Sequence, residues 1–279
     1  MSSATKFDRS VPAADLVARY QQRLWEALAI AEAAAARGAK ALYPALMALE
    51  NLLMSDLLTE QEQAALAEDP NLQDFALRSR KLFCELELHI ENNLVLLFSG
   101  REASDRLLHH PGNIMHNYLT RFEILVRKEI ALAAIVPGSH LLMIGSGYFP
   151  STAIELAGQA GCRIDCVDFV AEAVATSRKF IANIGLDDRI TIIHGRGEER
   201  DCGQYDAVLV GCLAQPKPKI MANMAVTAAP HCRVVCRTTL GARSFMWKPV
   251  GPDELEPYRP IRSFRATGTQ HLSSMLVGL

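Results

Sequence analysis

The chain has 279 residues, of which 49% are hydrophobic, and a formal net charge of −2. It can therefore bury the core of one or two domains, which excludes a disordered or fibrous protein. Because 29 lysines and arginines nearly balance 31 aspartates and glutamates, the overall charge favours neither nucleic acid nor an anionic membrane as a partner.

The N-terminal sequence and the cysteines both favour a soluble, cytoplasmic protein. The first residues lack the basic and apolar regions of a secretory signal, and no later stretch has about 18 apolar residues without a charge. The cysteines are odd in number and include no C-x-x-C pair, so we expect reduced thiols in the core. They are Cys84, Cys162, Cys166, Cys202, Cys212, Cys232 and Cys236.

Successive amphipathic helices are predicted up to about residue 135. Apolar residues recur there three and four positions apart, and glycine is rare. We expect helices at about 11–37, 41–58, from 60 onward as a short element, 72–99 and 115–135. Thr59 is the predicted N-cap of the third helix, Gly38 and Gly100 are placed to end the first and fourth, and Pro111-Gly112 precedes the last.

The pattern changes after Pro137-Gly138-Ser139. Short apolar runs at 140–144, 163–168, 190–194, 205–210 and 233–237 predict strands, and helical spacing lies between them. Strands that alternate with helices predict a parallel sheet in a doubly wound domain. Residues 264–266 and 274–277 are expected to pair antiparallel at one edge, with Gly268 at the turn.

The predicted fold class is therefore α/β, with two domains. Residues 1–135 form an all-α domain, and residues 136–279 form a Rossmann-like domain with a mostly parallel sheet.

The first strand ends in a glycine-rich turn, Gly145-Ser146-Gly147. Glycines let the backbone approach a ligand closely, and ligands of such sheets bind at the carboxyl ends of the strands. The spacing does not match the dinucleotide fingerprint G-x-G-x-x-G. Asp168 ends the second strand, where a carboxylate can bind ribose hydroxyls; alternatively, it only caps the next helix. The combination favours S-adenosylmethionine (AdoMet) over NAD.

Several polar residues are candidates for chemistry, each with a plainer alternative. Glu85, Glu87 and Glu91 fall on one helix and could simply form a solvated face, and Tyr118 could be a core residue with its hydroxyl paired. Arg237 and Arg243 could bind a substrate carboxylate or hold the C-terminal segment.

No metal site is expected. The eight histidines are scattered, and the adjacent pair His109-His110 is poorly spaced to bind one metal together.

Read together, several segments resemble nicotianamine synthase and its bacterial relatives that make opine metallophores of the staphylopine and pseudopaline type. The resemblance covers most of the chain. It is carried by Arg80-Lys81, Leu88-His89-Ile90-Glu91, Asn117-Tyr118-Leu119, Ile144-Gly-Ser-Gly-Tyr-Phe-Pro-Ser-Thr152, Tyr205-Asp206, Ala214-Gln-Pro-Lys217, Arg237-Thr-Thr-Leu-Gly-Ala-Arg243 and Ser273-Ser274. Plant and archaeal members commonly read Gly-Pro-Leu-Pro-Leu-Thr where this chain has Gly147-Tyr-Phe-Pro-Ser-Thr152.

The resemblance implies a class I AdoMet-dependent transferase domain whose active site is covered by the helical domain. The transferred group would be 3-amino-3-carboxypropyl (aminobutyrate), and methylthioadenosine would be released. Residues matching Glu91 and Tyr118 line the family's reaction chamber, so Glu91 becomes the expected base and Tyr118 its hydrogen-bond partner. The expected AdoMet-binding residues are Gly145, Ser146, Gly147, Pro150, Thr152, Asp168, Phe169, Gly195 and Glu198, and the expected substrate-binding residues are Arg237 and Arg243.

Bacterial members add one aminobutyrate unit to histidine, so the resemblance implies histidine as the acceptor, without choosing between its D and L forms. The product would pass to an opine dehydrogenase that couples it to a 2-oxo acid. No metal is required, and a homodimer is left open.

Three other functions remain open on the sequence alone. They are nicotianamine synthesis from several AdoMet units, AdoMet-dependent methylation of a small amine, and AdoMet binding without catalysis. The co-product and the acceptor requirement distinguish these alternatives.

Overall fold

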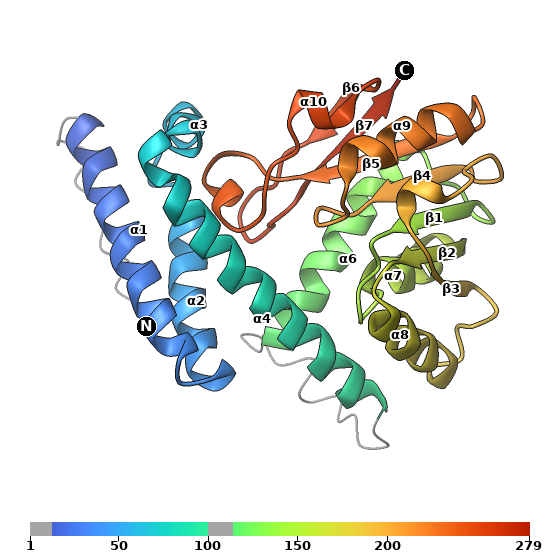
Figure 1. Ribbon diagram of the computed structural model, residues 1–279, viewed down its shortest axis with the longest axis horizontal. Coiled ribbons are helices and arrows are strands. Elements are labelled where there is room, and N and C mark those ends of the chain that lie inside the picture. Colours follow the sequence, from blue (N-terminus) through green and yellow to red (C-terminus); the bar gives the residue numbers. More distant parts are fainter. Residues whose placement is uncertain (1–12, 100–113) are drawn as a thin grey trace. The chain divides into compact units, whose positions relative to one another are not determined.

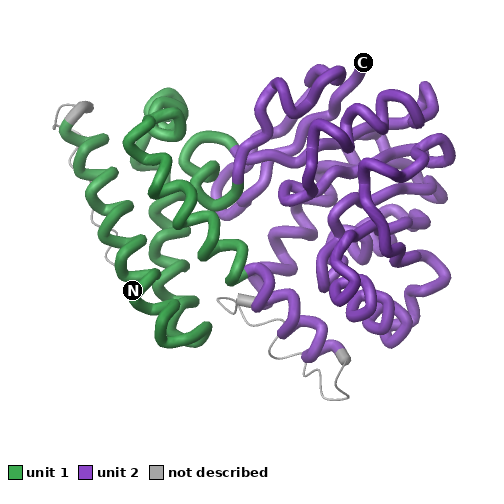
Figure 2. Tube along the Cα trace, in the orientation of Figure 1, with its two compact units in different colours: residues 1–86, 240–247 green, residues 87–239, 248–279 purple. Residues whose placement is uncertain are grey.

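The computed structural model describes residues 13–99 and 114–279, which fall into two compact units (Figures 1 and 2). The first unit contains residues up to 86 and residues 240–247, and the second contains 87–239 and 248–279. The predicted features at residues 11–12, Gly100, His109-His110 and Pro111-Gly112 lie outside the described residues. No helix within the described ranges is long and apolar enough to cross a membrane.

The first unit is helical, as predicted. It contains α1 (Ala13–Ala35), α2 (Ala39–Leu53), α3 (Glu60–Glu68), the 3-10 helix η1 (Pro70–Leu72) and the first half of α4 (Gln73–Ser99). Tyr20 of α1 is buried and donates its hydroxyl to the carbonyl of Leu52 at 2.7 Å, which ties α1 to α2. Thr59 caps α3 as expected: its hydroxyl accepts from the Glu62 amide, and the Glu62 carboxylate accepts from the Thr59 amide.

The first unit also includes residues 240–247, which follow the fifth strand and contain η3 (Gly241–Phe245). Phe245 packs edge-on against Phe75 of α4, with ring centroids 5.1 Å apart. Arg80, also on α4, donates to the carbonyl of Ser244 at 2.8 Å. Aromatic packing and a long-range hydrogen bond therefore bring this segment into the helical unit, although the sequence analysis placed it with the C-terminal domain.

The second unit combines the remaining helices with one sheet. Its elements are the rest of α4, α6 (Ile114–Ala133), β1 (His140–Ile144), α7 (Ser151–Ala160), β2 (Arg163–Asp168), α8 (Ala171–Asn183), β3 (Ile190–His194), η2 (Gly197–Glu199), β4 (Ala207–Val210), α9 (Lys217–Thr227), β5 (Arg233–Thr238), α10 (Pro252–Leu255), β6 (Arg259–Phe264) and β7 (Ser273–Gly278).

In the described part of the chain the sheet has seven strands, in the order β3-β2-β1-β4-β5-β7-β6 (Figure 1). The first five strands are parallel, and β7 runs antiparallel to both β5 and β6. The Rossmann-like, mostly parallel sheet is confirmed, and so is the antiparallel edge. The edge strand β6 begins at Arg259, earlier than predicted, because its side chains are mostly exposed and give little apolar signal.

Helices cover both faces of this sheet. Leu142 and Val208 belong to a core cluster with Met221 of α9 and Leu255 of α10, so these helices cover one face. Arg237 alternates with the core residue Cys236 on β5 and contacts α6 instead, so α6 covers the opposite face.

A buried ion pair fixes α6 to the sheet. Two of the guanidinium nitrogens of Arg237, Nε and Nη2, donate to the carboxylate of Glu129 on α6 at 2.8 Å, and the Ser274 hydroxyl of β7 donates to the same carboxylate at 2.7 Å. Glu129 is 0% exposed and Arg237 is 3% exposed. This pair explains why α6 belongs to the second unit, so the domain boundary predicted at residue 135 falls inside that unit.

We expect Arg237→Met to destabilise the protein by about 3–5 kcal/mol, because it leaves the Glu129 carboxylate buried without its counter-charge. Urea unfolding followed by circular dichroism measures this loss. The control is Arg127→Met on the same helix, whose ion pair with Glu123 is exposed and should contribute about 1 kcal/mol or less. Equal losses in the two variants would contradict the importance of the buried pair.

Candidate active site

The strand order reverses between β1 and β4, and the candidate site lies at the carboxyl ends of these strands. The two loops approach closely here. The Gly211 amide after β4 donates to the Ile144 carbonyl at 2.9 Å, and a Cβ on Gly211 would lie 3.0 Å from that oxygen. A Cβ on Gly145 would lie 3.2 Å from the Cβ of Ala214. Glycine is required at positions 145 and 211, because a side chain at either position would keep the loops after β1 and β4 apart.

Asp168 connects the end of β2 to the glycine turn after β1. Its Oδ2 accepts from the Gly147 amide and its Oδ1 from the Val170 amide, each at 2.9 Å. Val170 is itself the N-cap residue of α8, so Asp168 does not cap the first turn of that helix. Its role in ribose binding stays a prediction; the structure places it beside the predicted AdoMet-binding turn.

The other residues expected to bind AdoMet lie around the same strand ends. Ser146 has a buried hydroxyl oxygen with no hydrogen-bond partner among the described residues, so this oxygen is available to a ligand. Pro150 and Thr152 are buried at the start of α7, and Phe169 has 59% of its surface exposed. Gly195 donates its amide to the Asp168 carbonyl at 3.1 Å, and Glu198 pairs with Arg196 at 3.7 Å.

Glu91 lies directly against the glycine turn. Its Oε2 accepts from the Tyr148 amide at 2.9 Å, and its Oε1 accepts from the Tyr118 hydroxyl at 3.2 Å. A Cβ on Gly147 would come within 2.7 Å of Oε2. The structure thus brings together the two predicted catalytic residues, one from α4 and one from α6, and the predicted AdoMet-binding turn.

The environment of Glu91 favours a base. Desolvation by burial raises the pKa of Glu91 to about 8, and the charge of Glu87 also raises it. Burial raises the pKa of Tyr118 well above its ordinary value, so this hydroxyl stays neutral and can donate to Glu91. A carboxylate with a pKa near 8 can take up a proton from an amine more readily than an ordinary carboxylate can.

The predicted substrate-binding arginines lie elsewhere. The Arg237 guanidinium makes a two-point contact with the Glu129 carboxylate. Arg243 is buried in η3 of the first unit, and its charge acts on Tyr20. A substrate role for either residue stays a prediction. Glu85 is exposed and lies 3.9 Å from Lys81, which fits the solvated-face alternative.

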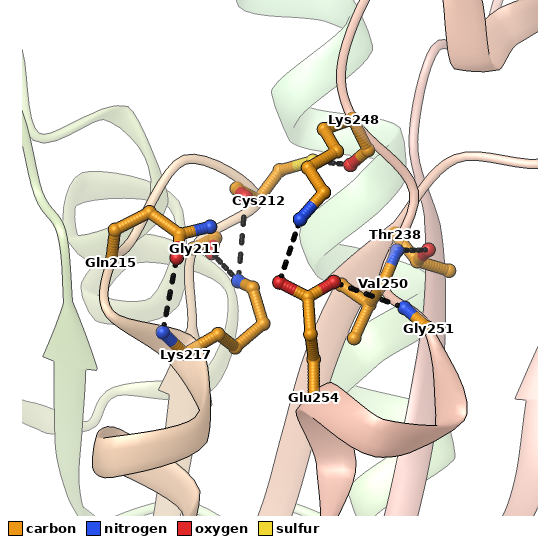
Figure 3. Close-up of polar contacts among 9 residues, drawn as sticks. All are labelled: Gly211, Cys212, Gln215, Lys217, Thr238, Lys248, Val250, Gly251 and Glu254. Atoms are coloured by element: carbon orange, nitrogen blue, oxygen red, sulfur yellow. Dashed lines mark hydrogen bonds and ion pairs between the residues drawn. The ribbon is translucent and has the colours of Figure 1, made fainter.

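A buried lysine organises the loop after β4 (Figure 3). Lys217 is 1% exposed, and its Nζ donates to the carbonyls of Gly211 at 2.9 Å and Cys212 at 3.3 Å. Gln215 accepts from the Lys217 amide at 3.1 Å. The ammonium group therefore holds together the loop that meets the glycine turn.

The neighbouring segment is anchored separately. In Figure 3, Lys248 pairs with Glu254 at 3.0 Å, and the Thr238 hydroxyl accepts from the Val250 amide at 2.9 Å. These contacts fix the chain where it leaves β5 and reaches α10.

Sequence reasoning gave no role to Lys217, Tyr148, Glu87 or Arg121. Tyr148 acts through its backbone, which no side-chain pattern reveals. Glu87 and Arg121 form an ion pair at 2.5 Å beside Glu91 and Tyr118. The available signal was helical spacing, because Glu87 lies one turn before Glu91 and Arg121 one turn after Tyr118.

Within the described ranges, no group of three or more His, Cys, Asp or Glu side chains could hold a metal ion.

A Rossmann-like sheet with a glycine turn, an acidic second strand end and a buried carboxylate at the switch point defines a class I AdoMet-dependent transferase fold. Residues 44–277 match the family described as nicotianamine synthase protein, and the chain belongs to this family.

Characterised relatives fall into two named groups. A Pseudomonas aeruginosa protein named L-histidine 2-aminobutanoyltransferase is 29% identical over 219 residues, which cover 76% of each chain. A Yersinia pestis protein of the same name is 28% identical over 48% of this chain and 50% of its own. Nicotianamine synthase 3 of Oryza sativa subsp. indica is 26% identical over 66% of this chain and 56% of its own.

Solved structures share the fold. The structure of MtNAS in complex with MTA and tNA superposes with a TM-score of 0.83 at 22% identity, covering 92% of this chain and 97% of that one. A mutant of MtNAS in complex with S-adenosylmethionine gives a TM-score of 0.78 at 22% identity, covering 94% and 96%.

The contact between Gly147 and Glu91 predicts that Gly147→Ala destabilises the protein by about 1–2 kcal/mol or more. Gly147 has φ +70°, which costs an alanine about that much, and the new Cβ would also displace Glu91. Gly158→Ala is the matched control, because Gly158 lies inside α7 and no atom lies within 4 Å of its Cβ position. This variant should be more stable than the unmodified protein by about 0.5–1 kcal/mol. Urea unfolding should show changes of opposite sign in the free energy of unfolding of the two variants. Equal changes would contradict the close packing of Gly147 against Glu91.

Proposed function

We propose that this protein transfers the 3-amino-3-carboxypropyl group of AdoMet to the α-amine of L-histidine and releases methylthioadenosine. The observation that carries the proposal is Glu91. It is a desolvated carboxylate with a raised pKa, it accepts from Tyr118, and it lies against the glycine turn in a chain of the nicotianamine synthase family.

The acceptor is proposed from the relatives. The Pseudomonas aeruginosa and Yersinia pestis proteins carry L-histidine in their names, and the Pseudomonas aeruginosa protein matches most of this chain. The plant relative, named nicotianamine synthase, is less similar. These similarities support one transfer to L-histidine over the condensation of several AdoMet units.

The reaction requires an in-line displacement at carbon. The lone pair of the neutral amine attacks the Cγ of the methionine moiety, the C–S bond breaks, and sulfur keeps the electron pair as methylthioadenosine leaves. The proton lost by the amine passes to Glu91, and Tyr118 holds the carboxylate in position. Position alone selects Cγ over the methyl carbon, because all three carbons on the sulfonium are electrophilic.

AdoMet would bind at the carboxyl ends of β1 to β3. Asp168 would accept from the ribose hydroxyls, and the Gly145–Gly147 turn with the Ser146 hydroxyl would contact the methionine part. Phe169, Gly195 and Glu198 would lie toward the adenine.

The proposed setting is the cytoplasm, with a second enzyme downstream. The seven cysteines are thiols and not disulfides, a state that a reducing compartment maintains. The product is a secondary amine that retains a primary amine, so an opine dehydrogenase could couple it to a 2-oxo acid to complete a metal chelator.

Mass spectrometry of the purified protein with AdoMet and L-histidine, D-histidine or no acceptor tests the proposal. We expect methylthioadenosine together with an aminobutyrate adduct of L-histidine. S-Adenosylhomocysteine and a methylated product would instead identify a methyltransferase. Adducts formed without histidine would identify nicotianamine-type synthesis, and binding without turnover would exclude an enzyme acting on these substrates.

Glu91→Gln should lower kcat by about 100-fold or more while leaving AdoMet binding nearly unchanged, because the amide cannot accept the amine proton. In the unmodified enzyme, kcat/KM should fall as pH drops below about 8, since protonation of Glu91 removes the base. Initial rates of methylthioadenosine release from pH 6 to 9.5, with calorimetric titration of AdoMet, measure both effects.

The control for this variant is Glu85→Gln, which changes an exposed carboxylate on the same helix and should leave turnover and its pH profile unchanged. Full activity in Glu91→Gln would remove Glu91 from the mechanism.

A further inference from the structure

We propose that Glu87 and Arg121 are positioning residues for the reaction: their ion pair holds the Tyr118 ring against Glu91 and sets the charge around the base. The inference rests on the proposed function and concerns residues for which that function requires no direct contact with substrate.

A continuous series of contacts joins these four residues across α4 and α6. Arg121 Nη2 donates to Glu87 Oε2 at 2.5 Å, and the Arg121 guanidinium carbon lies 4.7 Å from the centre of the Tyr118 ring. The Tyr118 hydroxyl then donates to Glu91. Glu87 and Glu91 share one face of α4, and Tyr118 and Arg121 share one face of α6, because each pair is separated by one helical turn.

Besides Glu87 and Tyr118, His271 also contacts the Arg121 guanidinium. Its Nη1 lies 2.8 Å from Nδ1 of His271, ahead of β7. An arginine can only donate, so Nδ1 of His271 accepts and carries no proton in this arrangement. The guanidinium is therefore fixed between a carboxylate and an imidazole, with its planar face on the Tyr118 ring.

A pair of opposite charges near a base has two opposing effects. The charge of Glu87 raises the pKa of Glu91, and Arg121 neutralises that charge while lowering the pKa of Tyr118. Among the described residues, the charged and titratable groups around this centre include Glu87 on α4 and Tyr118 and Arg121 on α6. Tyr148 and Asp168 lie at the strand ends, and His271 and the Arg237–Glu129 pair lie on the side of β5 and β7.

The two single variants should therefore move the acid limb of the kcat/KM profile in opposite directions. Glu87→Gln removes the negative charge, so the limb should move to lower pH by about 1 unit. Arg121→Met leaves Glu87 uncompensated, so the limb should move to higher pH by about 1 unit. The double variant should return the limb toward that of the unmodified enzyme, which a purely structural role would not produce.

Arg121→Lys separates charge from stacking. A lysine keeps the positive charge but lacks the planar guanidinium that stacks on the Tyr118 ring. The acid limb of the kcat/KM profile should therefore stay near its original pH while kcat falls several-fold. The control variants, Glu123→Gln and Arg127→Met, remove an exposed ion pair from the same helix and should change neither quantity.

A carbon-13 NMR titration of the Glu91 carboxyl, assigned by its loss in Glu91→Gln, provides a readout that needs no turnover. The same opposite shifts of the Glu91 pKa should appear in the unliganded full-length protein. If the unmodified protein makes no methylthioadenosine, the proposed function fails and this titration still tests the ion pair. Shifts in one direction for both variants, or shifts no larger than those of the controls, would overturn the inference.

Discussion

The candidate active site depends on the contact between the Glu91 carboxylate and the backbone at Gly147 and Tyr148. A carboxylate can reach this backbone only because Gly147 has no side chain, since a Cβ would lie 2.7 Å from Oε2. Backbone hydrogen bonds from Tyr148 and Phe149 and the hydroxyl of Tyr118 lower the pKa of Glu91. Desolvation by burial outweighs these three hydrogen bonds, so the pKa of this carboxyl stays raised.

Two ion pairs involving α6 support this contact, and they differ in kind. The pair of Arg237 with Glu129 is buried and joins α6 to the sheet, which fixes where Tyr118 lies. The side chains of Arg121 and Glu87 retain 17% and 16% exposure, and their pair joins α6 to α4 beside Glu91. The sequence offered two roles for Arg237, a substrate contact or an anchor for the C-terminal segment, and its pairing with Glu129, which Ser274 of β7 also contacts, fits the second.

Residues with a regular pattern could be predicted from the sequence, and residues that depend on tertiary contacts could not. Local apolar runs predict the strands at 140–144, 163–168 and 190–194, and the structure confirms them. Capping chemistry predicts the Thr59 cap, which the structure also confirms. Residues 240–247 join the helical unit through Phe245 and Phe75, a pairing that no local pattern encodes. Similarly, Tyr148 contributes its backbone amide, and the Lys217 ammonium binds the backbone carbonyls of Gly211 and Cys212, so no pattern of side chains describes either contact.

The raised pKa of Glu91 would also limit the proposed reaction, because a carboxyl group with a pKa of about 8 is mostly protonated at neutral pH. Cations resolve this difficulty, since any positive charge that binds beside Glu91 favours its ionised form. Both proposed substrates bring one: AdoMet carries a sulfonium, and an amino acid enters with an ammonium group. Binding would therefore lower the pKa of Glu91 as the site fills, so that the ionised base forms mainly when both reactants are present. An exposed glutamate would be ionised before either reactant arrived, so burial would couple the ionisation of Glu91 to the binding of the proposed substrates.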